Sequence, residues 1–140
     1  MLYEVLLRKL TYLRQLLADL TPYEGATLAD VRAEHYKVER LFELLVLTAS
    51  DILFHVLADY DLTPDSYRNA FRLASECDLL PADLAERLQD AAGMRNVIVY
   101  LYQEIDYTIL HTSIGPALRD FKQFVALFEE RLDHIASLEE

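Results

Sequence analysis

Apolar residues recur every three or four positions along most of this chain, which is the spacing of one face of an α-helix. The first stripe covers residues 2–20, and Pro22 with Gly25 supplies the signal that ends it. A longer stripe covers residues 31–57 and follows Thr27, whose position before an apolar run is typical of a helix cap. The pattern predicts two amphipathic helices in the first half of the chain, the second a single long helix that starts at Thr27.

The second half of the chain shows three further helical stretches separated by proline and glycine. Thr63 as the cap and Pro64 as the first helical residue are expected to start the third helix. Residues 78–81 start a fourth helix, and the pair Gly115-Pro116 breaks or kinks the chain before the last one. The apolar positions of the last helix are Leu118, Phe121, Phe124, Val125, Phe128, Leu132 and Ile135.

Composition agrees with a helical domain. Only three glycines and four prolines occur among 140 residues, which leaves few positions for the tight turns that β-hairpins need. Hydrophobic residues make up 53% of the chain and charged residues 26%, a balance that excludes a disordered chain. We therefore expect residues 1–140 to form one all-α domain, an antiparallel up-and-down bundle of four to six helices joined by short loops.

Net charge and cysteine content limit which ligands and which cellular compartment are expected. The net charge of −11 makes the whole surface a poor match for nucleic acid, although the ten arginines could gather at one place. Cys77 is the only cysteine and no signal peptide is evident, as expected for a reduced cytoplasmic protein. The apolar run 41–58 contains Glu43, Asp51 and His55, which favours a buried core helix over a membrane span.

Residues 93–102 hold the polar groups with the clearest chemical potential. Arg95 and Tyr102 are seven positions apart and share a helix face, offset by about 20°. Asn96 and Tyr100 share a different face, with Tyr100 about 140° from Arg95. A compact site therefore needs a local distortion of the helix or a second subunit that closes the cleft. The alternative is an ordinary polar seam on a helix.

This segment resembles the Arg-(four residues)-His-x-Tyr motif of the HEPN superfamily, and in particular of its HepT-like branch. Arg95 and Tyr102 match the first and last positions of the motif, whereas Tyr100 occupies the histidine position. Three further segments resemble the HepT-like pattern in the same order along the chain: Asp51 to His55, Ser66 to Phe71 and Arg119 to Phe124.

The resemblance implies a helical HEPN-like fold and the toxin side of a prokaryotic toxin–antitoxin pair with metal-independent ribonuclease activity. It also implies a homodimer whose motifs face each other, RNA as a ligand, and a minimal nucleotidyltransferase as antitoxin. That partner adenylylates the motif tyrosine, which Tyr102 matches. In this scheme Arg95 stabilises phosphate charge with the help of Tyr102, Asn96 orients these groups, and Tyr100 stands in the histidine place.

Tyr100 leaves the enzyme activity open. A phenol ordinarily titrates near ~10, so it is not a base near neutral pH, although it donates hydrogen bonds and stacks on nucleobases. Ribonuclease activity is then weak or absent unless another histidine substitutes. The alternative to an active toxin is a non-catalytic helical dimer that binds the nucleotidyltransferase.

Asp51 and His55 lie one helical turn apart and are the secondary candidates. One interpretation places them beside Arg95, where they supply the imidazole that the motif lacks. The other is a buried polar pair that locks helix packing. The remaining histidines show no partner pattern and are expected at the surface or its boundary: His35, His111 and His134.

A helical bundle can also hold two metal ions between Glu-x-x-His motifs on facing helices. No such motif occurs in this sequence, so we expect neither a metal site nor a cofactor.

Overall fold

The computed structural model describes residues 2–100 and 107–139, with the backbone alone for residues 98–100 and 139. The described elements are α1 (Leu2–Leu20), a short 3-10 helix η1 (Thr21–Tyr23), α2 (Leu28–Ala33), α3 (His35–Ala58), α4 (Tyr67–Glu76), α5 (Ala82–Tyr100) and α6 (Tyr107–Glu139). The described part of the chain contains no strand, which confirms the all-α prediction.

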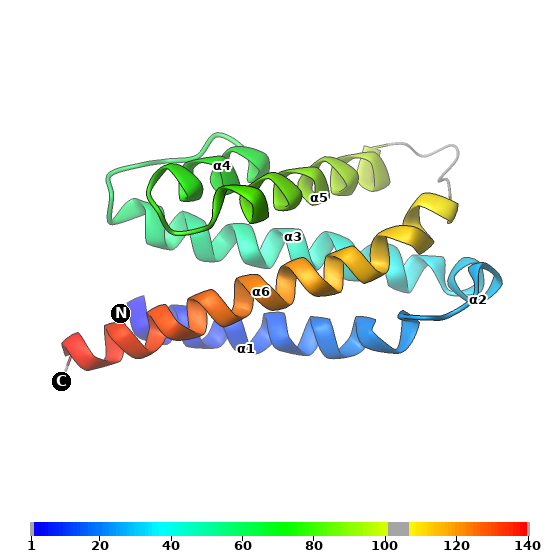
Figure 1. Cartoon of the computed structure of the whole chain (residues 1–140), viewed down its shortest axis with the longest axis horizontal. Coiled ribbons are helices and arrows are strands. Elements are labelled where there is room, and N and C mark those ends of the chain that lie inside the picture. The colour runs from blue at the N-terminus through cyan, green and yellow to red at the C-terminus, as the bar shows by residue number, and fades with distance from the viewer. Residues whose placement is uncertain (1, 101–106, 140) are drawn as a thin grey trace.

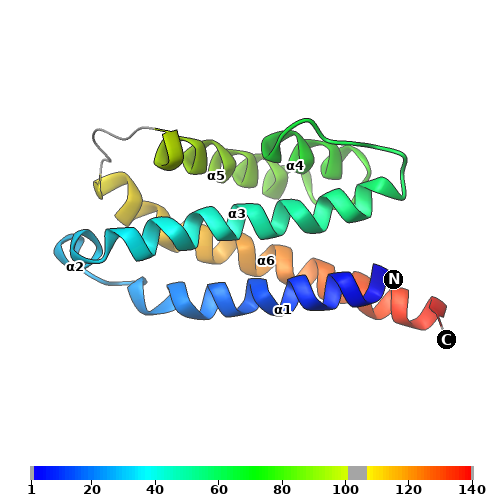
Figure 2. The ribbon, with the colours of Figure 1, turned by 180° about the vertical axis from the view of Figure 1, so that it is seen from behind.

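The four long helices α1, α3, α5 and α6 alternate in direction and form an antiparallel up-and-down bundle (Figure 1). Helix α3 runs through the middle, with α4 and α5 on one side and α1 and α6 on the other. The view from behind shows the same order (Figure 2). Both chain ends lie at one end of the bundle, and α2 lies at the other.

Phenylalanine and leucine side chains fill the space between the helices. Phe71 of α4 meets Phe124 of α6 edge-on at a ring-centroid distance of 6.5 Å, and Phe124 stacks on Phe128 at 4.6 Å. All three rings are buried, and burying one such side chain contributes about 1.5–3 kcal/mol. The apolar stripe of α1 is buried as the sequence predicts, from Leu6 to Leu20.

Helix α3 is long and apolar enough to span a membrane by length and composition, and no other described helix is. In the bundle, 61% of the most apolar 18-residue stretch of α3 is buried. Its hydrophobicity is accounted for by its central place in the core, in line with the expectation of a core helix.

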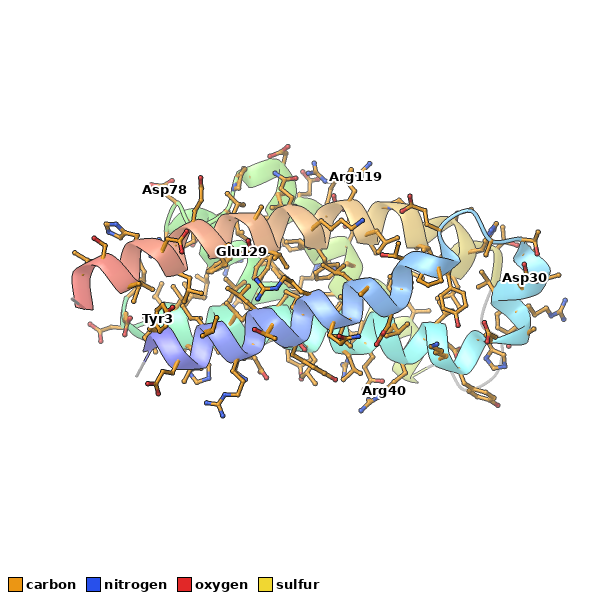
Figure 3. All side chains as sticks on the ribbon, turned by 90° about the horizontal axis from the view of Figure 1, so that it is seen from below. Tyr3, Asp30, Arg40, Asp78, Arg119 and Glu129 are labelled. Carbon is orange, nitrogen blue, oxygen red and sulfur yellow. The ribbon has the colours of Figure 1, made fainter. Side chains whose placement is uncertain are left out.

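Around the core, α1 and α6 are joined at the surface by a charged pair. Nη1 of Arg14 on α1 donates to Oε1 of Glu129 on α6 over 2.9 Å, and Figure 3 shows Glu129 between these two helices. Both side chains are nearly half exposed, so this pair adds little to stability.

The long helix expected to start at Thr27 is divided in two. Thr27 is indeed a cap, because its hydroxyl accepts from the backbone N–H of Asp30 over 3.1 Å. At Glu34, however, the backbone leaves the helical region (φ −116°, ψ 30°), which ends α2 and starts α3. The division lets α2 pack against α6 while α3 continues into the middle of the bundle.

The prediction that Thr63 and Pro64 start the next helix was wrong. Helix α4 begins at Tyr67, and its cap is Ser66, whose Oγ accepts from the N–H of Asn69 over 2.9 Å. The reason lies at the end of α3, where Asp61 adopts a positive φ of 58° and the N–H of Leu62 returns to the carbonyl of Leu57. The residues that follow are needed to span the distance to α4.

The pair Gly115-Pro116 does not break the chain, because α6 is one helix from Tyr107 to Glu139 with Pro116 inside it. The steric conflict between a proline ring and the preceding residue falls partly on that residue's Cβ. Gly115 has no Cβ, so the helix accommodates the proline at the cost of one backbone hydrogen bond.

Candidate functional site

Arg95 lies in the last turns of α5, on the side of that helix that faces α3 and α4. Its Cζ is 5.0 Å from the ring centroid of Tyr67 on α4. Its Nη2 is 4.0 Å from Oε1 of Glu43 on α3, and its Nη1 donates to Oδ1 of the neighbouring Asn96 over 3.2 Å. Three helices therefore fix the place of this guanidinium.

Tyr67 is held at the first position of α4 by the Ser66 cap. Its ring also lies 6.2 Å from that of Phe54 on α3, so it fills the angle between α3, α4 and α5. One face of the Arg95 guanidinium is covered by this ring, an arrangement in which arginine keeps its charge and its in-plane donors.

The ionic contacts of Arg95 are weak for a side chain so deeply placed. Only 14% of the side chain is exposed, yet among the described residues the nearest carboxylate oxygen is 4.0 Å away. That oxygen of Glu43 also accepts a closer ion pair from Arg40, at 2.9 Å. Nε of Arg95 is buried and has no hydrogen-bond partner among the described residues. Buried donors are normally satisfied, so this donor set is under-used.

Two other arginines, Arg68 and Arg72, lie on α4. The side chain of Arg72 already has two partners, because Nη1 donates to Oε1 of Glu76 and Nη2 to Oδ1 of Asn69, each over 2.6 Å. Arg68 has fewer contacts, since the only carboxylate near it in the described part of the chain is that of Asp90 at 4.0 Å. It lies along α5, where a Cβ at Gly93 would be 3.6 Å from its Nη1.

The remaining motif residues are only partly described. Asn96 is exposed beside Arg95, and α5 continues as a helix to Tyr100. The side chain of Tyr100 and the whole of Tyr102 lie outside the described residues. The roles expected of these two tyrosines stay predictions.

Asp51 and His55 are not brought to Arg95. They line a groove between α1 and α3, where Asp51 forms an ion pair of 3.6 Å with Lys9. His55 is exposed, and no hydrogen bond joins it to Asp51. Arg95 does not line this groove. The one-turn spacing would allow a contact between Asp51 and His55, but Asp51 pairs with the ammonium of Lys9 instead.

Two histidines that showed no pattern in the sequence do have partners. Nδ1 of His35 lies 3.0 Å from Oε2 of Glu39, a carboxylate that is only 7% exposed. Nε2 of His111 lies 2.6 Å from the carbonyl oxygen of Ala26. The spacing of four between His35 and Glu39 was the available signal, whereas the contact of His111 depends on the packing of α6.

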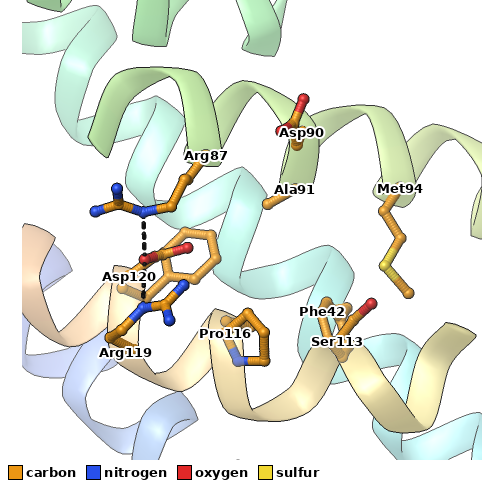
Figure 4. Close-up of a pocket in the computed structure, with 11 residues that line it drawn as sticks. Phe42, Arg87, Asp90, Ala91, Met94, Ser113, Pro116, Arg119 and Asp120 are labelled. Carbon is orange, nitrogen blue, oxygen red and sulfur yellow. Dashed lines mark hydrogen bonds and ion pairs between the residues drawn. The ribbon is translucent and has the colours of Figure 1, made fainter. Parts of the chain in front are cut away.

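A second cleft lies between α5 and α6 and has a charged end (Figure 4). There the buried carboxylate of Asp120 accepts from Nε of Arg87 over 2.9 Å and from Nε of Arg119 over 3.2 Å. Asp120 raises the pKa of Arg87, with Asp83 contributing to the same effect. The charges at this cleft neutralise one another, so we interpret them as a clamp that joins α5 to α6.

Within the described ranges, no group of three or more His, Cys, Asp or Glu side chains is placed to hold a metal ion.

Residues 6–128 match the family model of HepT-like proteins, described as "Ribonuclease HepT-like". This chain belongs to the HepT-like family. The match covers both α3 and the Arg95 helix, and it confirms the family indicated by the motif and the three weaker segments.

Two relatives and one solved structure extend the comparison. The "mRNA nuclease HepT" of Shewanella oneidensis is 33% identical over 76 residues, which are 54% of this chain and only 57% of that protein. The "tRNA nuclease HepT" of Aphanizomenon flos-aquae is 28% identical over 122 residues, 84% of this chain and 82% of that one.

The structure of a tri-AMPylated Shewanella oneidensis HEPN toxin in complex with its MNT antitoxin has a TM-score of 0.81. It is 21% identical and covers 90% of this chain and 97% of its own. At that identity the likeness shows a shared fold, so this chain has the HEPN-type helical bundle.

Proposed function

We propose that this protein is the toxin-side component of a toxin–antitoxin pair and acts on RNA through a site centred on Arg95. The observation that carries the proposal is the state of the Arg95 guanidinium. It is largely buried and positioned by three helices. Among the described residues, however, its nearest carboxylate is 4.0 Å away and one of its donors lacks a partner. A phosphate oxygen would complete this donor set, because guanidinium binds phosphate through two parallel hydrogen bonds.

The family and its relatives support RNA as the substrate class. Both relatives are named as nucleases of RNA, one of mRNA and one of tRNA. In a HepT-type scheme Arg95 stabilises charge on the phosphate, Tyr102 assists, and Asn96 keeps Arg95 in place. Tyr100 occupies the position where the family motif has its proton-transferring histidine, so cleavage by this chain should be slow.

We further propose a minimal nucleotidyltransferase as the partner. The related Shewanella toxin is AMPylated and bound to an MNT antitoxin. In this chain Tyr102 matches the motif tyrosine and is the proposed site of adenylylation. Mass spectrometry after incubation with such a partner and ATP should show AMP addition that the Tyr102→Phe variant lacks. Addition that persists in Tyr102→Phe would place the modification elsewhere.

The proposed setting is cytoplasmic, which suits a protein with a single unpaired cysteine and a cellular RNA substrate. A homodimer is proposed as the functional form, because one helix does not gather Arg95, Tyr100 and Tyr102 on a single face. A two-fold axis through α5 would bring two such sets together.

Cleavage of a labelled RNA tests the function directly. The Arg95→Ala variant should lose at least about tenfold in rate, and Arg95→Lys should recover only part of it, since lysine lacks the bidentate geometry. Arg14→Ala is the matched control, because Arg14 also pairs with a glutamate but lies between α1 and α6.

If Arg95→Ala and the unaltered protein cleave or bind RNA equally well, the site is misplaced. A folded protein that neither binds nor cleaves RNA, but still binds the nucleotidyltransferase, would favour the second candidate function, a non-catalytic docking subunit. The observation that favours this candidate is the tyrosine at position 100.

A further inference from the structure

The end of the bundle where α2 meets α3 carries a row of flat side chains. We call it the α2–α3 corner and define it as Arg32, His35, Tyr36 and Tyr107. The ring of His35 lies 4.0 Å from that of Tyr36 and 5.0 Å from that of Tyr107, measured between centroids. Cζ of Arg32 lies 5.5 Å from the centroid of Tyr107. Three rings and a guanidinium thus follow one another across α2, α3 and α6.

A buried carboxylate holds the middle of this row in place. Nδ1 of His35 is 3.0 Å from Oε2 of Glu39, one turn further along α3, and Glu39 is 7% exposed. The other carboxylate oxygen, Oε1, is also buried and has no partner among the described residues. The imidazole is therefore fixed by its own helix, which pre-organises the rings packed against it and lowers the entropy cost of binding on them.

Tyr36 is the outer member of the row, and 80% of it is exposed. A single exposed tyrosine needs no explanation, but Tyr36 contacts the anchored ring of His35 at an interplanar angle of 40° and presents its aromatic surface to solvent. Such a face suits a flat ligand that stacks, and nucleobases are the flat groups that aromatic side chains bind in single-stranded RNA.

The charges around the corner favour an anionic partner despite the net charge of −11. Arg32 is exposed and forms no ion pair with any described residue. Oε2 of Glu39 lies against His35 and Glu43 pairs with Arg40, whereas Asp30, also on α2, is exposed and forms no ion pair with a described residue. Glu34 hydrogen-bonds Tyr23, whose pKa is raised by burial and by this contact. The cation of Arg32 is thus left available for a phosphate.

The α2–α3 corner and the Arg95 site are linked by residues along one face of α3. Tyr36 and Arg40 are one helical turn apart, and Figure 3 shows Arg40 projecting away from the bundle. Arg40 pairs with Glu43, which reaches Arg95. The rise from Tyr36 to Glu43 is about 10 Å, so a strand only a few nucleotides long spans both places.

We propose that the α2–α3 corner is a base-stacking subsite for a single-stranded RNA whose phosphate is held at Arg95. One base stacks on Tyr36, and Arg32 pairs with a neighbouring phosphate. The proposal rests on the proposed action on RNA and adds the form of the substrate. A duplex, whose bases are stacked on each other and shielded, does not offer a free base face to Tyr36.

Binding of a fluorescently labelled single-stranded RNA tests the subsite. The Tyr36→Ala variant should weaken binding by about tenfold, the scale of one lost base stack, and Tyr36→Phe should bind as the unaltered protein does. Arg32→Ala should weaken binding and reduce its salt dependence. Tyr12→Ala is the matched control, because Tyr12 is an exposed tyrosine in the groove between α1 and α3.

Abasic substitutions in the RNA separate stacking from a structural role. One abasic position should weaken binding to the unaltered protein and have no further effect on Tyr36→Ala, because the two changes remove the same contact. Circular dichroism of each variant checks that the helices are intact.

The outcomes distinguish this proposal from the one on which it rests. Unchanged affinity of Tyr36→Ala, together with weaker binding by Arg95→Ala, would overturn the subsite and keep the proposed function. Absence of RNA binding by the unaltered protein would overturn both. Loss of nucleotidyltransferase binding in Tyr36→Ala, with RNA binding intact, would make the corner a protein interface and the stacking proposal wrong.

Discussion

Among the arginines of the described residues, Arg95 is distinguished by the mismatch between its burial and its partners. Arg14, Arg72 and Arg87 are more exposed, and each holds a carboxylate within 2.9 Å. Arg95 has only 14% of its side chain exposed and its nearest carboxylate at 4.0 Å. An arginine that only stabilised the fold would be expected to use its donors, so its placement is better explained by a ligand.

The substitution at position 100 gives a residue-scale prediction. Tyr100→His restores to the motif the one side chain type that ordinarily exchanges a proton near neutral pH. We expect RNA cleavage to rise by at least about tenfold to a hundredfold, values up to the lower end of the range for a positioned general acid–base. The measurement is the single-turnover rate on one RNA for both proteins. Tyr100→Phe, which keeps the ring and removes the hydroxyl, is the control.

Equal rates for the unaltered protein and Tyr100→His would mean that proton transfer is carried by another group. His35 would then be the next residue to replace, because it is the described histidine held by a buried carboxylate. His55, the sequence-based candidate, is exposed in the groove between α1 and α3 and does not contact the Arg95 site.

The sequence singled out Arg95 because it matches the first position of a known motif, and Asn96 because it is the neighbour of Arg95; the roles given to both stay predictions. It did not identify Tyr67 or Glu43 as their neighbours, since these contacts join α5 to α4 and α3 across long separations in the chain. The His35–Glu39 pair was within reach of sequence reasoning, because its spacing of four places both side chains on one helix face.

At the scale of helices, apolar periodicity predicted the long elements well and local signals predicted their ends less well. The stripe of α1 and the phenylalanines of α6 are buried as expected. The start of α4 was misplaced by three residues, because Ser66 and Thr63 are both acceptable caps and only the tertiary path from α3 selects between them. Pro116 does not end a helix as the local signal suggests, because Gly115 before it has no Cβ to clash with the proline ring.

The assignment of the α4 cap is testable by stability. Ser66→Ala removes the acceptor for the N–H of Asn69 and should lower the free energy of unfolding by about 1 kcal/mol. Thr63→Ala should change it by less than about 0.5 kcal/mol, because Thr63 caps no helix. Urea unfolding followed by circular dichroism measures both. A larger loss for Thr63→Ala than for Ser66→Ala would contradict the assignment.

At the scale of the whole molecule, the bundle has a packed centre and one end toward which both proposed binding sites lie. The α5–α6 clamp at Asp120 and the phenylalanine core fix the helices, while the Arg95 site and the α2–α3 corner lie toward the end that holds α2. The local arrangement of charges, rather than the net charge of −11, governs what such an end binds.

The prediction at this scale concerns the oligomeric state of the protein. We expect a homodimer whose interface includes α5 near Arg95, because two copies gather motif groups that one helix keeps apart. Sedimentation velocity at micromolar concentration should show a species of twice the mass of the chain, 16.2 kDa. Replacement of the exposed Val97 by Glu should shift it toward monomer, whereas Leu138→Glu, near the opposite end, should not. A monomer for the unaltered protein would contradict this assembly.

The central claim is that Arg95 binds an RNA phosphate, and a filter-binding titration over a range of salt concentrations tests it most directly. Arg95→Ala should bind single-stranded RNA more weakly, and the slope of log affinity against log salt should fall by about one relative to the unaltered protein. Arg14→Ala should change neither quantity by as much. If Arg95→Ala retains both the affinity and the salt slope of the unaltered protein, Arg95 is a structural residue and the account given for this site is wrong.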